Sequence, residues 1–134
     1  MHKAENVKEV ELATISFGQS FQITPLQLMA ATSAVINGGT RITPHFVTEI
    51  VNNAGVTIKT VDGIGETGVV SEETSEMMRT VLEQVVSEGT GHNAYVEGFS
   101  IGGKTATSEK LPRRSGKYIA SFLGFAPAMN PQVI

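Results

Sequence analysis

The sequence predicts an α+β fold in which helices flank antiparallel strands. Two segments carry apolar residues at helical spacing between a capping residue and glycine, and two others alternate apolar and polar residues around a polar turn. The chain has 134 residues, of which 40% are hydrophobic. This length and composition fit one domain-sized unit with a modest core.

The first helix is predicted over residues 25–37. Thr24 can cap it, Pro25 suits the first helical position, and two glycines follow residue 37. Four apolar residues fall on one face at helical spacing, so we expect this face to pack against the core. They are Leu28, Ala31, Ala34 and Val35.

The second helix is predicted over residues 71–88. Ser71 can cap it, and Glu72 and Glu73 lie in its first turn, where the helix dipole favours anions. Gly89 ends it. The pair Met77 and Met78 is assigned to the core, and the apolar stripe comprises Met78, Val81, Leu82, Val85 and Val86.

Two β-hairpins are predicted, over residues 41–61 and 99–126. In the first, the alternating segments 46–51 and 56–61 surround a turn at residues 52–55. In the second, two strand-like segments flank a long polar loop. Five of the ten basic residues lie between positions 104 and 117, so we expect a solvated hairpin tip.

Composition excludes several function classes. The net charge of −3 gives no electrostatic reason to bind nucleic acid, and the absence of cysteine excludes disulfides and thiolate zinc sites. The three histidines lack the spacing of a metal site, so no metal or other cofactor is expected. No apolar run reaches the length of about 18 residues that spans a bilayer, and the charged N-terminus does not resemble a signal peptide.

The segment from Gly98 to Thr105 matches the phosphate-loop pattern G-x-x-x-x-G-K-S/T. A phosphate loop opens a helix, whereas the residues after Thr105 have no apolar helical stripe and include Pro112 and Gly116. The context therefore argues against nucleotide binding.

Lys104 and Thr105 also fit the K-T-G element of the serine acyl-transferases of the penicillin-binding class. Three blocks resemble penicillin-binding transpeptidases in order and spacing: residues 11–50 with G-Q and T-P-L-Q, residues 85–110 with G-T-G and G-K-T-A-T, and residues 118–131 with S-F-L-G-F-A-P. The resemblance covers residues 11–134 and is to the class B, monofunctional enzymes.

The resemblance implies a partial β-lactamase/transpeptidase-like fold and a reaction on peptidoglycan. In that family a serine attacks the D-Ala–D-Ala stem peptide, releases the terminal D-alanine and passes the acyl group to an amine of a second strand. β-Lactams mimic D-Ala–D-Ala and acylate the same serine. The implied partners are therefore a peptidoglycan stem peptide and β-lactams, with no nucleotide or nucleic acid.

The resemblance also implies roles for four residues. Lys104 supplies positive charge for the substrate carboxylate, Thr105 and Thr107 supply hydroxyls for it, and the Thr107 N–H is an oxyanion-hole donor. Ala106 stands where the family usually has glycine, so its methyl group could crowd the ligand. Ser20, in the G-Q-S turn, also stands where the family has glycine, and this departure is milder.

The nucleophile that the resemblance implies is missing from this sequence. No serine begins an S-x-x-K motif and no S-x-N occurs. Thr107 and Lys110 have the S-x-x-K spacing with threonine in place of serine, but they belong to the same segment as the K-T-G-like element. Both motifs lie upstream of F-G-Q in the family, so residues 1–134 are interpreted as a C-terminal fragment of a transpeptidase domain, inactive alone. The parent protein would act on the extracytoplasmic face of the bacterial membrane.

An alternative function remains open: a stand-alone, non-catalytic module that binds a peptide or a protein along a strand edge. An S-x-x-K motif upstream in the same reading frame would eliminate it. For the fragment we expect a homo-oligomer, because the strand at 118–126 would present an unpaired edge beside apolar side chains.

Overall fold

The computed structural model describes residues 7–19, 22–110, 112 and 114–134. Ser20, which replaces a glycine of the family pattern, therefore lies outside the described residues. The elements occur in the order α1 (Glu9–Ser16), α2 (Pro25–Ile36), β1 (Glu49–Val51), β2 (Thr57–Thr60), α3 (Glu72–Ser87), a short 3-10 helix (His92–Ala94), β3 (Gly102–Glu109) and β4 (Tyr118–Phe125). Both sheets are two-stranded and antiparallel, β1 with β2 and β3 with β4, which confirms the α+β prediction.

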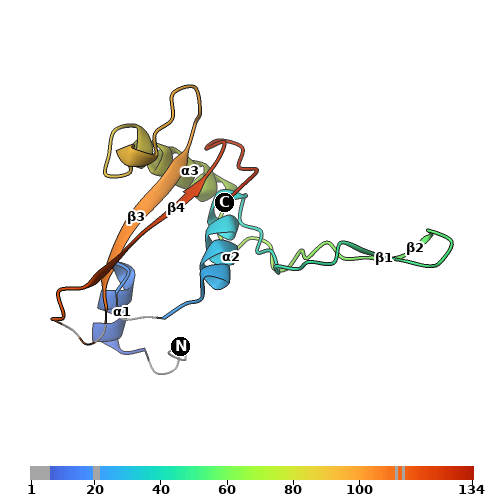
Figure 1. Ribbon diagram of the computed structural model, residues 1–134, viewed down its shortest axis with the longest axis horizontal. Coiled ribbons are helices and arrows are strands. Elements are labelled where there is room, and N and C mark those ends of the chain that lie inside the picture. Colours follow the sequence, from blue (N-terminus) through green and yellow to red (C-terminus); the bar gives the residue numbers. More distant parts are fainter. Residues whose placement is uncertain (1–6, 20–21, 111, 113) are drawn as a thin grey trace.

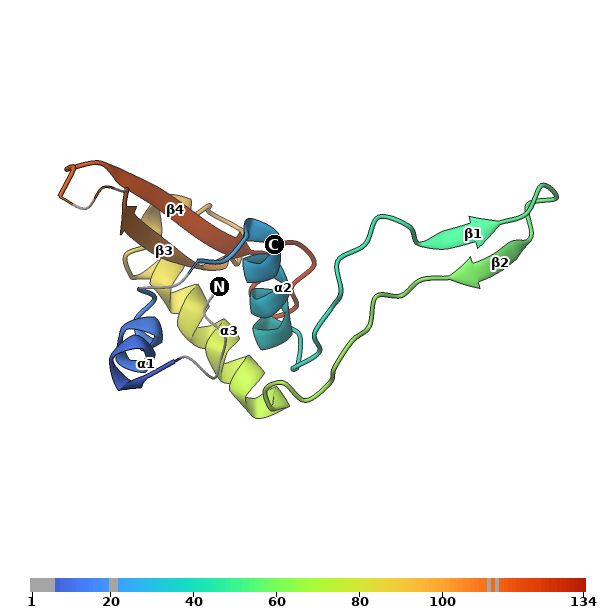
Figure 2. The ribbon, with the colours of Figure 1, turned by 90° about the horizontal axis from the view of Figure 1, so that it is seen from below.

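The body of the molecule is formed by α2, α3 and the β3–β4 hairpin. Helix α3 packs along β3, and α2 packs beside α3 (Figures 1 and 2). The central cluster of buried residues comprises Ile36 from α2, Phe125 from β4 and Ala128, with Val35 and Leu82 packed around it. This core therefore joins the end of α2 to the start of the β3–β4 sheet.

Helix α2 begins where the sequence predicts. Thr24 Oγ1 accepts from the Gln27 N–H at 3.2 Å, and Gln27 Oε1 accepts from the Thr24 N–H at 3.1 Å, so the two residues form a capping box. The predicted apolar face is only partly right, because Ala34 is buried but Leu28 is 40% exposed and Ala31 is exposed. The buried positions lie in the last turn, where α2 meets the core.

Helix α3 also has its predicted cap, since Ser71 Oγ accepts from the Thr74 N–H at 3.1 Å. The buried positions are Ser75, Arg79 and Val86. The assignment of Met77 to the core is wrong because this side chain is 61% exposed, and Val81 is 47% exposed. The face that packs inward is thus shifted from the apolar stripe and includes two polar residues.

A buried polar cluster connects the start of α3 to the end of α2. Arg79 Nη1 donates to the Ile36 carbonyl oxygen at 2.9 Å and to Ser75 Oγ at 3.0 Å. Ser75 Oγ also accepts from the Gly38 N–H at 3.0 Å, and Arg79 Nη2 lies 3.6 Å from Glu72 Oε1. The guanidinium therefore satisfies a carbonyl at the C-terminal end of α2 that the helix itself leaves unpaired.

The β1–β2 hairpin projects away from the body as an arm (Figures 1 and 2). Its turn is held by Asn52, whose Oδ1 accepts from the Ala54 and Val56 N–H groups at 2.9 and 3.0 Å. Gly55 has a φ of +76°, which glycine adopts without steric cost. The hairpin was predicted correctly, but its strands are shorter than expected and all of their residues are exposed.

Two elements were not predicted. Helix α1 has no buried residue, and its apolar residues do not gather on one helical face, so no periodic pattern indicated it. The 3-10 helix His92–Ala94 follows the loop after α3, and the His92 and Tyr95 rings stack with their centroids 5.5 Å apart. Among the described residues, no helix is both long and apolar enough to cross a membrane.

Candidate functional site

The four residues of the predicted site lie in the middle of β3. They pair in register with β4, with Lys104 opposite Leu123, Thr105 opposite Phe122 and Thr107 opposite Ala120. The second hairpin is therefore confirmed near its predicted limits. Because Lys104 and Thr105 lie inside an antiparallel strand, they do not begin the helix that a phosphate loop requires.

Strand geometry distributes the four side chains over two faces. Lys104 and Ala106 share one face of β3, and Thr105 and Thr107 share the other. Thr105 is half-buried and the other three are exposed. The methyl group of Ala106 thus points to the same side as the Lys104 stem and away from the threonine hydroxyls.

The Lys104 side chain bends around the strand and brings its charge to Thr105. Nζ donates to the Thr105 carbonyl oxygen at 2.8 Å and to Thr105 Oγ1 at 3.4 Å. A cation and a hydroxyl group consequently meet at one point of the strand. Such a pair suits a carboxylate, which accepts hydrogen bonds from both.

A second hydroxyl group, which the sequence did not single out, reaches the same point. Thr90 Oγ1 lies 3.3 Å from Thr105 Oγ1, although the two residues are 15 positions apart. Thr90 is the central residue of the G-T-G segment that follows α3. The sequence placed this segment in a family block but gave no sign that its hydroxyl faces Thr105.

Glycines before Lys104 make room for two aromatic rings. A Cβ atom at Gly102 would overlap the buried Phe125 ring, and one at Gly103 or Gly124 would overlap the Phe122 ring. Phe125 fills the core, whereas Phe122 lies over the glycines on the face of Thr105 and is 42% exposed. Gly102 and Gly103 therefore let β3 sit close against the aromatic residues of β4.

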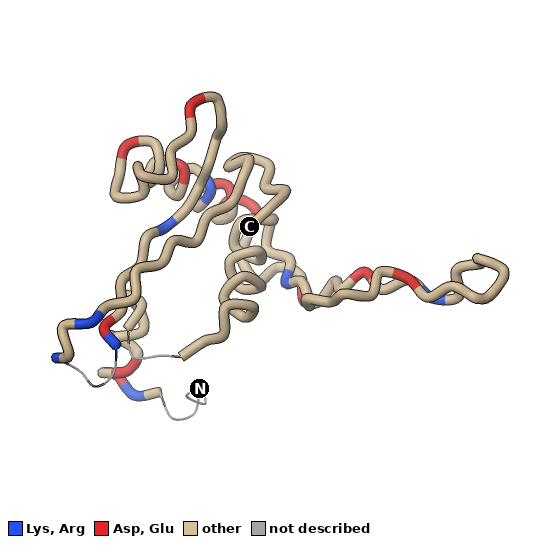
Figure 3. Tube along the Cα trace, in the orientation of Figure 1, with Lys and Arg blue, Asp and Glu red and all other residues tan. Residues whose placement is uncertain are grey.

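The basic residues of the hairpin tip are solvated, as predicted, at the positions that the structure describes. Lys110, Arg114 and Lys117 are exposed, while Arg113 lies outside the described residues. Figure 3 shows Lys and Arg positions gathered at the far end of the β3–β4 hairpin, whereas Lys104 lies within β3. Lys104 is thus separate from the tip.

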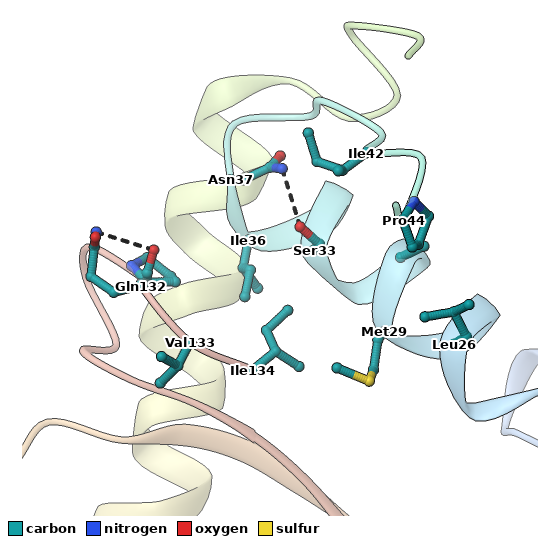
Figure 4. Close-up of a pocket in the computed structure, with 12 residues that line it drawn as sticks. Leu26, Met29, Ser33, Ile36, Asn37, Ile42, Pro44, Gln132, Val133 and Ile134 are labelled. Atoms are coloured by element: carbon teal, nitrogen blue, oxygen red, sulfur yellow. Dashed lines mark hydrogen bonds between the residues drawn. The ribbon is translucent and has the colours of Figure 1, made fainter. Parts of the chain in front are cut away.

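An apolar groove of about 330 Å³ lies between α2 and the C-terminal residues (Figure 4). Leu26, Met29 and Ile36 line one wall, and Val133 and Ile134 line the other. None of the four site residues borders it. Among the described residues there is also no cluster of three or more His, Asp or Glu that could hold a metal.

Comparison with known proteins identifies the family. The penicillin binding protein transpeptidase domain matches residues 2–134. This chain belongs to the penicillin-binding protein transpeptidase family. The family resemblance inferred from the three sequence blocks is thereby confirmed.

Curated members of this family resemble the chain along almost all of its length. Stage V sporulation protein D of Bacillus subtilis (strain 168) is 47% identical over 136 residues, which cover 97% of this chain and 21% of that protein. The peptidoglycan D,D-transpeptidase FtsI homolog of Mesostigma viride is 32% identical over 141 residues, covering 93% of this chain and 24% of that protein. The chain thus spans roughly a quarter or less of these relatives.

Solved structures of penicillin-binding transpeptidases share the fold. Penicillin binding protein 3 from Mycobacterium tuberculosis, complexed with ampicillin, superposes with a TM-score of 0.82 at 27% identity, covering 98% of this chain and 31% of that chain. The D,D-transpeptidase domain of a peptidoglycan glycosyltransferase from Eggerthella lenta gives a TM-score of 0.69 at 30% identity, covering 85% of this chain and 27% of that chain.

Proposed function

We propose that this chain supplies the substrate-recognition strand of a transpeptidase that cross-links peptidoglycan stem peptides through an acyl-enzyme. The observation that carries the proposal is the meeting of the Lys104 ammonium group and the Thr105 hydroxyl group at one point of β3. The D-alanine that leaves ends in a carboxylate, and β-lactams carry one as well. A cation beside a hydroxyl group recognises that shared anion.

In the proposed reaction, a serine Oγ forms an ester with the carbonyl of the penultimate D-alanine, and the C–N bond to the terminal D-alanine breaks. The serine proton ends on the leaving amine. An amine of a second stem peptide then attacks the ester, forms the cross-link and restores the serine. No S-x-x-K occurs in these 134 residues, so the serine comes from another part of the protein.

Residues of β3 act on the substrate in this scheme without forming covalent bonds. Lys104 and Thr105 hold the carboxylate, and Thr107 adds a second hydroxyl from the same face as Thr105. The Thr107 N–H donates to the oxyanion of the tetrahedral intermediate. The edge of β3 that does not pair with β4 aligns the peptide as an added strand. The reaction takes place on the extracytoplasmic face of the bacterial membrane.

Labelling with a fluorescent penicillin tests the proposal. We expect the full-length protein to take up one label, on the serine of an S-x-x-K motif. The 134-residue chain by itself should take up none after prolonged incubation, because it lacks that serine. Intact-mass measurement and peptide mapping check both results. An unlabelled full-length protein would favour the non-catalytic binding module, and an adduct on a serine of this chain would show that the nucleophile is misassigned.

We also propose that the isolated chain self-associates through β4. Among the described residues, β4 pairs along its length only with β3, and its exposed side chains include Tyr118, Ile119 and Phe122. An open strand edge beside apolar groups is a template for pairing with another chain. Light scattering over a range of concentrations should detect a dimer or larger species, and a monomer at the highest concentration would exclude this association.

A further inference from the structure

Ala106 lies between the two points of β3 that meet the ends of the acyl donor's reacting part in the proposed function. The carboxylate of the leaving residue meets Lys104 and Thr105, and the carbonyl that the serine attacks meets the Thr107 N–H. Consecutive residues of a strand advance by about 3.3 Å, so residue 106 lies beside the short stretch of ligand that joins these two groups. In D-Ala–D-Ala this stretch is the nitrogen and the Cα atom of the terminal residue, and in a β-lactam the same two atoms belong to the fused ring.

The methyl group of Ala106 is not used by the packing of the hairpin. Its Cβ atom lies on the Lys104 face of β3, and the residue is exposed. Across the hairpin on the same face its partner is Ser121, which is also small and exposed. Among the described residues, Ala106 thus lies outside the central buried cluster, and its methyl surface is left for a ligand.

Two other positions of β3 show where the hairpin itself requires glycine. A Cβ atom at Gly102 would overlap the Phe125 ring, and one at Gly103 would overlap the Phe122 ring. Position 106 has no such restriction, because its Cβ atom is present and exposed. The limit on side-chain size at position 106 therefore comes from the ligand and not from the fold.

We propose that the Ala106 methyl group is a specificity determinant that restricts the leaving group of the acyl donor to a small residue such as D-alanine. This inference rests on the proposed function. The carbon atom that bears the carboxylate also bears the side chain of the leaving residue, so a larger side chain competes with the methyl group for the same space. Overfilling a packed contact is unfavourable, and a single methylene group in a pocket is enough to separate two substrates. Glycine at position 106 would leave room for a larger leaving residue.

The test uses thioesters of N-acyl-D-alanine with 2-mercapto acids, in which sulfur replaces the leaving nitrogen and the released thiol reports the reaction. The carbon atom next to the carboxylate carries a methyl group in one donor and an isobutyl group in the other, with the configuration of D-alanine in both. In the full-length protein, we expect Ala106→Gly to raise the ratio of kcat/KM values, isobutyl over methyl, by about tenfold or more, the size of effect that methylene groups have in a pocket. Ala106→Val enlarges the side chain and should lower the ratio.

Ala120→Gly is the matched control, because it makes the same substitution on β4, opposite Thr107 and on the other face of the hairpin. It adds the same backbone freedom and should leave the ratio at the wild-type value. An unchanged ratio in Ala106→Gly, or an equal rise in Ala120→Gly, would overturn the specificity role, while turnover of the methyl donor would still support the proposed function. A wild-type protein that releases thiol from neither donor and takes up no penicillin would contradict the proposed function and this inference with it.

Discussion

Replacing Lys104 by alanine is expected to slow acylation by penicillin by about 10²- to 10³-fold in the full-length protein, the usual effect of removing one electrostatic donor from an acyl-transfer site. The ammonium group is the only cation in contact with Thr105 among the described residues. Without it, the carboxylate loses its counter-charge and Thr105 loses a donor. The second-order rate constant, measured from the time course of fluorescent labelling, checks the result.

Lys110→Ala is the matched control for this prediction. It removes the same side chain from an exposed position just after β3, near the hairpin tip. Screened surface charges contribute little, so its labelling rate should remain close to that of the wild-type protein. Equal losses for Lys104→Ala and Lys110→Ala would mean that net charge steers the ligand and that Lys104 has no specific role.

The parts of the fold that sequence predicted well depend on neighbouring residues. The caps at Thr24 and Ser71 are made by residues three positions apart, so the local sequence contains the whole interaction. The turn around Asn52 and the β3–β4 hairpin are also local. The roles given to Lys104, Thr105, Ala106 and Thr107 rest on the family pattern and stay a prediction, whereas the strand that they occupy was predicted from the strand-like segments on either side of the polar loop.

The parts that sequence missed depend on packing between distant segments. Hydrophobic periodicity shows that a helix has an apolar face but not which partner covers it, so Leu28 and Met77 were placed in the core although both are exposed. Arg79 is buried because the Ile36 carbonyl lies next to it, 43 positions away. The contact of Thr90 with Thr105 likewise arises from the packing of α3 on β3.

Phe125→Ala is expected to destabilise the protein by about 3–5 kcal/mol, the range for removing a buried aromatic side chain. The ring is 2% exposed and packs against Ile36 at the end of α2, with Leu82 of α3 also at this core. It also faces Gly102, directly across the β3–β4 pair. Chemical denaturation of the full-length protein measures the loss, and Phe46→Ala, which truncates a fully exposed phenylalanine three residues before β1, is the matched control.

The same variant shows how the core supports the site. Gly102 lies opposite Phe125 and two residues before Lys104, so the ring sets the position of β3 where the site begins. If Phe125 acts only through folding, the fraction of labelled Phe125→Ala protein falls while the folded molecules react at the wild-type rate. If it also fixes the strand, the rate constant itself falls. Phe125→Ala and Phe46→Ala remove the same side chain, so their effects on stability differ mainly in the apolar area that the ring buries. An equal loss of stability in the two variants would contradict the central place of the Phe125 ring in the core.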